Sequence, residues 1–133
     1  MKIDLNKIDI VINCKDELII NSYPEYFTVI IKNLISNSFL HGFKGKDKGK
    51  ITIDINLNNS NLTLIYKDNG KGVSPKLTNK VFDEFYTTKK GEGGTGLGLY
   101  IVKTIVENKL NGTISFQSEL GKGVEIKIIF PLD

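Results

Sequence analysis

Apolar and polar residues alternate along several segments of this chain, and a period of two predicts β-strands. Ile51, Ile53, Ile55 and Leu57 are separated by polar residues, so this segment is expected to form a half-buried strand. Shorter apolar or β-branched runs predict further strands at residues 8–12, 17–20, 62–66, 113–117 and 124–130. Since a polar segment, residues 13–16, separates the first two runs, these two strands are expected to form a hairpin.

Two longer segments carry apolar residues at helical spacing. The first covers residues 24–41, with Gly42 as a plausible stop, and the second covers about 96 to 109. The stripe of the first helix consists of Phe27, Ile30, Ile31, Leu34, Ile35 and Ser38. A short helical patch is expected around residues 77–82. Strands outnumber helices, which predicts an α/β (α+β) two-layer sandwich: one mixed, mostly antiparallel sheet with the helices on one face.

Composition and charge exclude several classes of protein. Residues 1–133, with 40% hydrophobic and 25% charged residues, are expected to form one globular domain. The formal net charge is +3, the lysines are scattered and arginine is absent, so no nucleic acid is expected as a partner. No apolar run approaches the roughly 20 residues that span a bilayer, so this domain itself is not expected to contact a membrane.

Cys14 is the single cysteine of the chain, so no internal disulfide can form. Together with the lack of a signal peptide, this favours a reducing, cytoplasmic location. A membrane anchor elsewhere in the parent protein stays open. With no His or Asp partner nearby in the sequence, Cys14 is interpreted as an ordinary strand or turn residue.

A glycine-rich run, residues 93–98, leads directly into the second helical pattern. Backbone N–H groups at the start of a helix lack intrahelical partners and favour an anion, so this run predicts a phosphate cradle. Residues 91–96 fit G-x-G-x-x-G, but no strand precedes them and no βαβ unit follows, which excludes a dinucleotide fold. The chain contains no Walker-type G-x-x-x-x-G-K-[ST] sequence.

Two further constellations are compatible with ligand binding. Asn33, Asn37 and His41 are spaced four residues apart, so they share one face of the first helix. An amide oxygen there is a suitable ligand for Mg²⁺, but a solvated polar face explains the pattern equally well. The segment Asp68–Val73 places a carboxylate at a strand end before two glycines, which suits recognition of an exocyclic amine. An ordinary Asp-Asn-Gly turn is the simpler interpretation of this segment alone.

In their order along the chain, four segments resemble the sequence boxes of the ATP-binding catalytic domain of sensor histidine kinases. This family also includes gyrase, the chaperone Hsp90 and MutL. Asn33–Asn37 is similar to the N box, Asp68–Val73 to the first glycine box, Phe82–Thr88 to the F box and Gly94–Leu99 to the second glycine box. Each box alone is weak evidence, but the four together, over residues 5–131, are specific.

The resemblance implies a Bergerat-type ATP-binding fold and assigns roles to several residues. Asp68 would accept a hydrogen bond from the adenine amino group. Asn37 would ligate Mg²⁺ between the phosphates, with Asn33 supporting the same face. Residues 74–93 would form a lid over the nucleotide, packed by its two phenylalanines. Lys89 or Lys90 is a candidate for a phosphate contact, although a solvated lid surface explains these lysines equally well, and His41 is another candidate. The nucleotide-binding residues are therefore expected to be Asn33, Asn37, His41, Asp68, Gly70, Gly72, Val73, Phe82, Thr87, Thr88, Lys89, Gly94, Thr95, Gly96, Leu97, Gly98 and Leu99.

Asn33 bears on the reaction, because hydrolysing relatives carry a glutamate at this position to activate water. An amide cannot accept a proton at neutral pH, so efficient ATP hydrolysis is disfavoured. The sequence instead predicts transfer of the γ-phosphoryl group to a histidine on a separate dimerisation domain of the same protein, with a response regulator downstream. Two alternatives stay open: a nucleotide-binding signalling module without transfer, and an anti-sigma-type serine kinase.

Two positions depart from the family pattern. Leu40 stands where many members carry a lysine or another polar residue next to the phosphates. Val124 stands where many carry a threonine that supports adenine binding. Either departure is expected to lower the affinity for the nucleotide.

Overall fold

The computed structural model describes residues 7–14, 24–46, 48–84 and 97–132. Five strands are present in this part of the chain: β1 (Ile8–Cys14), β2 (Gly49–Asn58), β3 (Asn61–Asp68), β4 (Thr113–Glu119) and β5 (Gly123–Pro131). The helical elements are α1 (Pro24–Asn37) with its continuation η2 (Ser38–Gly42), the short η3 (Pro75–Leu77), and α2 (Gly98–Thr104) with its continuation η4 (Ile105–Lys109). No described helix is long and apolar enough to cross a membrane.

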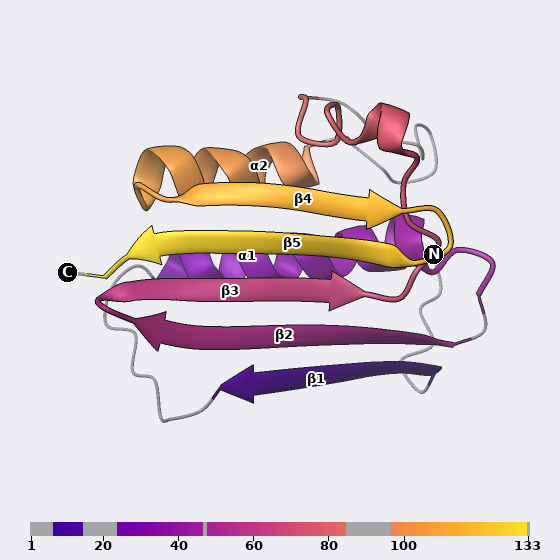
Figure 1. The fold of residues 1–133 in the computed structure, drawn as a ribbon, viewed down its shortest axis with the longest axis horizontal. Coiled ribbons are helices and arrows are strands. Elements are labelled where there is room, and N and C mark those ends of the chain that lie inside the picture. The colour runs from indigo at the N-terminus through magenta and orange to yellow at the C-terminus, as the bar shows by residue number, and fades with distance from the viewer. Residues whose placement is uncertain (1–6, 15–23, 47, 85–96, 133) are drawn as a thin grey trace.

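The strands form a single sheet in the order β1-β2-β3-β5-β4 (Figure 1). β1 and β2 are parallel, whereas the other three pairs are antiparallel. The sheet is therefore mixed and mostly antiparallel, as predicted. β3 and β5 are neighbours although η3 and α2 intervene in the sequence, and this pairing places Asp68 opposite Val124.

β1 is longer than predicted at its C-terminal end and the partner described for it is β2, while the predicted hairpin stays a prediction. β1 continues through Asn13 and Cys14, the first half of the expected turn, and pairs in parallel with β2 from Ile8 opposite Gly49. The Asn13 amide donates a hydrogen bond to Asp54 of β2, at 2.7 Å. Periodicity predicts a strand but not its partner, and here the partner is distant in sequence. Residues 17–20 lie outside the described residues.

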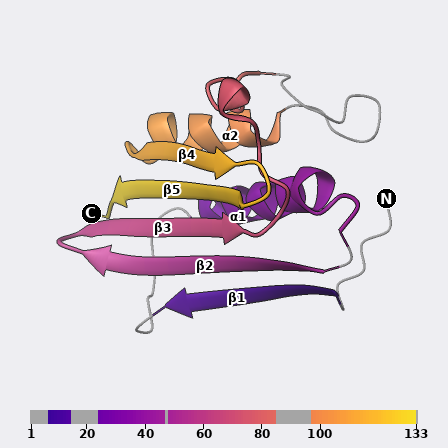
Figure 2. The same cartoon turned by 45° about the vertical axis from the view of Figure 1, so that its right-hand side comes forward.

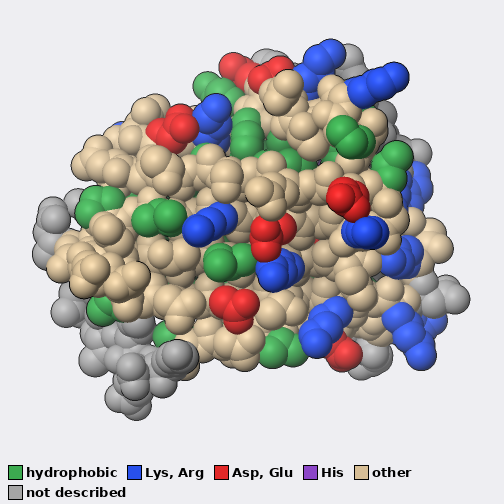
Figure 3. Space-filling model, viewed as in Figure 1, with side chains coloured by type: hydrophobic (Ala, Val, Ile, Leu, Met, Phe, Trp, Pro, Cys, Tyr) green, Lys and Arg blue, Asp and Glu red, His purple; other side chains and the backbone are tan. Residues whose placement is uncertain are grey.

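Both long helices lie on one face of the sheet, where they cover its core (Figures 1 and 2). Ile30 and Leu34 of α1, together with Val102 of α2, are buried to within 1% exposure against alternate residues of the central strands. The opposite face carries interspersed lysine, aspartate and glutamate side chains (Figure 3), including the Lys67–Glu125 ion pair at 3.3 Å. This division into two layers confirms the predicted sandwich.

The helix ends differ in detail from the predictions. α1 continues into η2 as a π-helix, in which the N–H of Phe43 donates to the carbonyl of Ser38 at 2.9 Å, five residues earlier. The helical segment thus ends at Gly42, as predicted. The helical patch expected at 77–82 is instead the single turn η3, which ends at Leu77 and is capped by the Ser74 side chain.

The core makes a testable prediction about two residues on the same strand. Ile53 is 1% exposed and Leu57 is 53% exposed, and both belong to β2. Ile53→Ala should lower the free energy of unfolding by about 2–5 kcal/mol, because it removes buried methyl groups and leaves a cavity. Leu57→Ala should change it by no more than about 0.5 kcal/mol. Urea denaturation measures both, and equal losses would contradict the described burial.

Candidate nucleotide-binding site

The site is centred on Asp68, a buried carboxylate at the end of β3 with 7% exposure. Its Oδ1 accepts hydrogen bonds from the backbone N–H groups of Gly70 (3.0 Å) and Val124 (3.1 Å). Its Oδ2 accepts from the hydroxyl of Ser38, at 2.6 Å. An ionised carboxylate has about four acceptor positions, so these three bonds leave one on Oδ2. The carboxylate can therefore accept one further donor.

Ser38 and Tyr66 extend this arrangement into the core. The Ser38 hydroxyl lies 2.5 Å from the Tyr66 hydroxyl, which in turn lies 3.0 Å from the carbonyl oxygen of Leu34 in α1. Burial raises the pKa of Tyr66 well above its usual range; the Ser38 hydrogen bond lowers it and the charge of Asp68 raises it. The phenol therefore stays protonated and acts as a donor.

The first glycine box is held tightly against the end of the π-helix. The N–H of Lys71 donates to the carbonyl of Gly42 at 2.9 Å. A Cβ at Gly70 would lie 2.6 Å from that same oxygen, so only glycine permits this approach. Gly72 has a φ of +73°, and a Cβ there would overlap the carbonyl oxygen of Glu119. The two glycines of this box thus serve close backbone packing.

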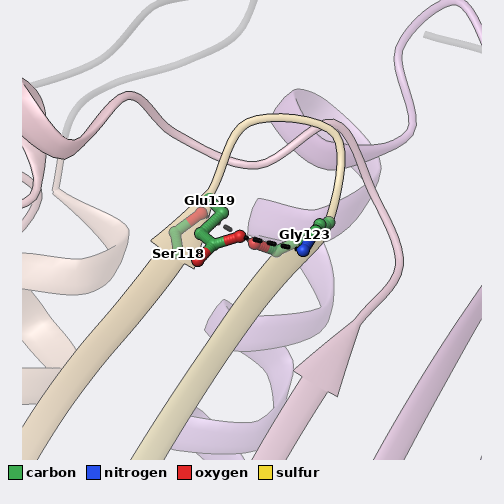
Figure 4. A network of polar contacts seen from close by, with 4 residues as sticks. Ser118, Glu119 and Gly123 are labelled. Carbon is green, nitrogen blue, oxygen red and sulfur yellow. Dashed lines mark hydrogen bonds and ion pairs between the residues drawn. The ribbon is translucent and has the colours of Figure 1, made fainter.

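The turn between β4 and β5 fixes the other side of this segment. The Ser118 hydroxyl donates to the carbonyl of Gly123 at 2.7 Å and accepts from the N–H of Val73 at 2.8 Å. Figure 4 shows Ser118 and Gly123 facing each other across the two strands, with Glu119 beside them at the start of the turn. The N–H of Gly121 also donates to the carbonyl of Lys71, at 2.7 Å. The backbone of Val73 is therefore held in place by the end of β4.

α1 connects this site to the second glycine box. The two helices α1 and α2 pack against each other. The Asn33 side chain donates to the carbonyl of Val29 at 2.8 Å, and its Oδ1 would lie 3.4 Å from a Cβ at Gly98. Asn37 and His41 follow at successive turns, and all three polar side chains are partly exposed. The structure thus brings the N box next to the start of α2, as the resemblance implies.

The start of α2 lies at the edge of the described residues. Leu97 occupies the N-cap position and its apolar side chain makes no capping hydrogen bond. The first N–H groups of a helix have no intrahelical partner, and in α2 these include the N–H groups of Gly98 and Leu99. Leu99 itself is buried at 9% exposure and anchors this end of α2 in the core.

Phe82 packs between the sheet and α2. Its ring contacts that of Phe116 in β4 edge-to-face, with centroids 5.9 Å apart, and the Lys103 ammonium lies 5.6 Å from its centroid. Val81 beside it is buried. These contacts attach the described part of the predicted lid, residues 74–84, to the core, while Phe82 as a nucleotide contact stays a prediction.

Several expected site residues lie outside the described residues. They are Thr87, Thr88, Lys89, Gly94, Thr95 and Gly96. Apart from Phe82, which packs against β4 and α2, the remaining expected residues lie at and just after the end of β3, on the partly exposed face of α1–η2, and at the start of α2.

The two residues that depart from the family pattern, Val124 and Leu40, differ in how far they are buried. The Val124 side chain is buried at 8% exposure and contributes no hydroxyl, but its backbone N–H contacts Asp68 directly. Leu40 is partly buried in η2.

Sequence reasoning missed three polar residues of the site: Ser38, Tyr66 and Ser118. Ser38 had a signal, because it is the one hydroxyl in an otherwise apolar helical stripe that faces the core. Tyr66 and Ser118 had no such signal. In the sequence, Tyr66 resembles any inward-facing strand residue, and Ser118 resembles any polar residue of a strand with alternating polarity. Their roles depend on partners 28 to 45 residues distant, in the contacts Ser38–Tyr66, Ser38–Asp68 and Val73–Ser118.

A match to a family model is consistent with this geometry. Residues 23–133 match the model described as "Histidine kinase-, DNA gyrase B-, and HSP90-like ATPase". The matched region includes every site element described above.

Curated relatives of the chain are named as sensor proteins. The chain is 32% identical over 133 residues to a probable C4-dicarboxylate sensor kinase of Bacillus subtilis, with 95% of this chain and 24% of that protein covered. It is 39% identical over 106 residues to the sensor protein SrrB of Staphylococcus aureus, with 77% and 18% covered. The chain therefore spans a quarter or less of the length of these relatives.

Solved structures of histidine kinases share the fold. The catalytic domain of the histidine kinase ThkA, in a nucleotide-free form, superposes with a TM-score of 0.79 at 25% identity, with 95% of this chain and 81% of that chain covered. Full-length ShkA, in complex with AMPPNP, superposes with a TM-score of 0.78 at 24% identity, with 94% and 26% covered. With the family match over most of its length and the Asp68 site at the end of β3, the chain belongs to the histidine kinase-, DNA gyrase B- and HSP90-like ATPase family, as a histidine kinase-like ATPase domain.

Proposed function

We propose that this domain binds Mg-ATP between the end of β3 and the start of α2, across the partly exposed face of α1 and η2. The observation that carries the proposal is the remaining acceptor position on the buried Asp68 carboxylate. An acceptor-only group in this place suits the exocyclic amino group of adenine. The nucleotide complex of the fold relative ShkA supports the choice of ligand.

The phosphates are proposed to lie at the start of α2. Backbone N–H groups of Gly98 and Leu99, and the helix dipole behind them, favour negative charge there. Gly96, Thr95 and Gly94 are proposed to continue this cradle.

Mg²⁺ is proposed to be held by Asn37, with Asn33 supporting the same face. Among the described residues, no three His, Cys, Asp or Glu side chains lie close enough together to hold a metal ion. One partly exposed amide oxygen nevertheless fits Mg²⁺, which takes one or two protein oxygens and completes its shell with phosphates and water. When bound, the ion neutralises charge on the β- and γ-phosphates.

The reaction proposed is phosphoryl transfer to a histidine supplied by a dimerisation domain of the same protein. A neutral imidazole nitrogen attacks the γ-phosphorus, the bond to the β–γ bridging oxygen breaks, and ADP leaves. The imidazole is itself the nucleophile, so no general base is required of this domain. Asn33, whose amide is hydrogen-bonded to Val29, is a poor base for activating water, which favours transfer over hydrolysis.

The wider setting is part of the same proposal. The relatives are sensor proteins of which this chain matches only a part, which supports an acceptor-histidine domain in the parent protein and a response regulator downstream. The domain is proposed to act in the cytoplasm without contacting a membrane itself. Residues 74–93 are proposed to cover the bound nucleotide as a lid, attached at Val81 and Phe82.

The role of Asp68 predicts the effect of a nearly isosteric change. Asp68→Asn should weaken Mg-ATP binding roughly 10- to 100-fold, because an amide loses the charge-assisted acceptor that the adenine amino group needs. Calorimetry measures the dissociation constant. Asp54→Asn, on β2 and away from the site, is the matched control and should bind normally. Unchanged affinity in a folded Asp68→Asn domain would place the nucleotide elsewhere.

The role of Asn37 predicts a loss that depends on magnesium. For the native domain, ATP affinity should be higher with Mg²⁺ than with EDTA, and Asn37→Ala should remove most of this difference. Affinity in EDTA should change little. Asn108→Ala, at an exposed position of η4, provides the control. A full magnesium effect in Asn37→Ala would exclude this residue as the ligand.

The transfer step has its own experiment. The domain, mixed with γ-labelled ATP and the acceptor-histidine domain of its parent protein, should produce an acid-labile phosphohistidine. Asp68→Asn should abolish the label at limiting ATP. Tight Mg-ATP binding with no labelled acceptor would favour a binding module, and an acid-stable phosphoserine would favour a serine kinase.

A further inference from the structure

A chain of buried hydroxyl groups leads from the core to Asp68, and the proposed chemistry does not use it. Tyr66 and Ser38 are each 1% exposed, yet their oxygen atoms lie 2.5 Å apart, and Ser38 lies 2.6 Å from Oδ2 of Asp68. Buried polar groups cost free energy unless they are paired, and apolar side chains of the same volume would fill this space without that cost. The presence of these buried hydroxyl groups therefore calls for an explanation beyond packing.

The direction of each hydrogen bond follows from counting protons. An ionised carboxylate only accepts, so Ser38 gives its single proton to Asp68. Its Oγ must then accept from Tyr66, whose phenol is kept protonated by burial. Tyr66 has one proton, shared between Ser38 and the carbonyl of Leu34. The Ser38 proton thus points toward the carboxylate, and Tyr66 supports Ser38 with a proton that it shares with Leu34.

The Ser38 bond also helps to hold the carboxylate in its orientation. The N–H groups of Gly70 and Val124 both bind Oδ1. The bond from Ser38 holds the other oxygen, Oδ2, which is the one that keeps an acceptor position for a ligand. Gly42 keeps the approach to Oδ2 open, because a Cβ at this position would lie 3.1 Å from that oxygen.

We propose that Ser38 and Tyr66 are positioning residues which, through Asp68, make this domain select purines with an amino group over purines with a keto group at the same position. The proposal rests on the function proposed above. An oriented acceptor binds the amino group of ATP, whereas the keto oxygen of ITP or GTP meets a second acceptor. A site built around one hydrogen bond discriminates strongly against a ligand that leaves its buried group unpaired.

The test uses Ser38→Ala, Tyr66→Phe and the double variant, with dissociation constants for Mg-ATP and Mg-ITP from calorimetry. Ser38→Ala should weaken ATP binding roughly 10-fold and ITP binding less than about 2-fold, so that the preference for ATP falls. Tyr66→Phe should weaken ATP binding about 2- to 3-fold. In the Ser38→Ala background Tyr66→Phe should have no further effect on this preference, because the path to Asp68 is already broken.

Two control variants remove hydroxyl groups outside the site. Tyr100→Phe, on the exposed side of α2, and Ser115→Ala, on the exposed side of β4, should leave both dissociation constants unchanged. If Ser38→Ala does not fold, Tyr66→Phe decides the question, because it keeps the buried ring and removes only the oxygen. Thermal melting of each variant identifies which ones are folded.

The outcomes separate this inference from the proposed function. If the native domain fails to bind Mg-ATP, the proposed function is wrong. If the native domain prefers ATP and folded Ser38→Ala and Tyr66→Phe keep the full preference, the function stands and the positioning role is wrong. Additive effects of Ser38→Ala and Tyr66→Phe on the preference for ATP would also overturn the positioning role. If Tyr66 acts on Asp68 only through Ser38, the two effects cannot add.

Discussion

The buried carboxylate of Asp68 is the interaction on which the rest of the site depends. A charge with 7% exposure is tolerated only where donors surround it, and here they come from three separate segments. η2 supplies a hydroxyl, the loop after β3 supplies one N–H, and β5 supplies another. Each donor satisfies the charge and also ties its own segment to the end of β3. Fold and site are therefore specified by the same bonds.

The crossover order of the sheet is what makes this possible. Because β5 returns beside β3, Val124 lies directly opposite Asp68 in the register. The β4–β5 turn then packs on the segment after Asp68, through Ser118 and the close approach at Gly72. A sheet with strands in sequence order would leave the carboxylate without one of its N–H donors. The strand order thus supplies the buried carboxylate with the N–H donor of Val124.

α1 has two roles that its sequence combines in one helix. Its apolar stripe covers the sheet, and the next residue on that stripe, Ser38, reaches Asp68. Its polar face runs past the start of α2, where Asn33 adjoins Gly98. The helix therefore relates the site's two halves, the carboxylate at one strand end and the glycine-rich helix start, within one rigid element. The nucleotide proposed to bind across both halves would meet them at a fixed distance.

Much of the fold could be predicted because its signals are local. The alternation from Ile51 to Leu57 gave β2, the helical stripe gave α1 with its stop at Gly42, and the motif order indicated the family. The parallel pairing of β1 with β2 could not be predicted, because strand periodicity carries no information about a partner that is distant in sequence. Ser38 was visible only as an unexplained hydroxyl in an apolar stripe.

The sequence by itself determined most of the elements, the two-layer architecture and the candidate residues for nucleotide binding, because periodicity, glycine placement and motif order act over short distances. Only the tertiary structure decided which groups satisfy Asp68 and which way its carboxylate is turned. The hydrogen bonds from Ser38 and Val124 join residues 30 and 56 positions apart, and no local pattern specifies such a pairing. It arises when strand order and helix packing bring the groups together.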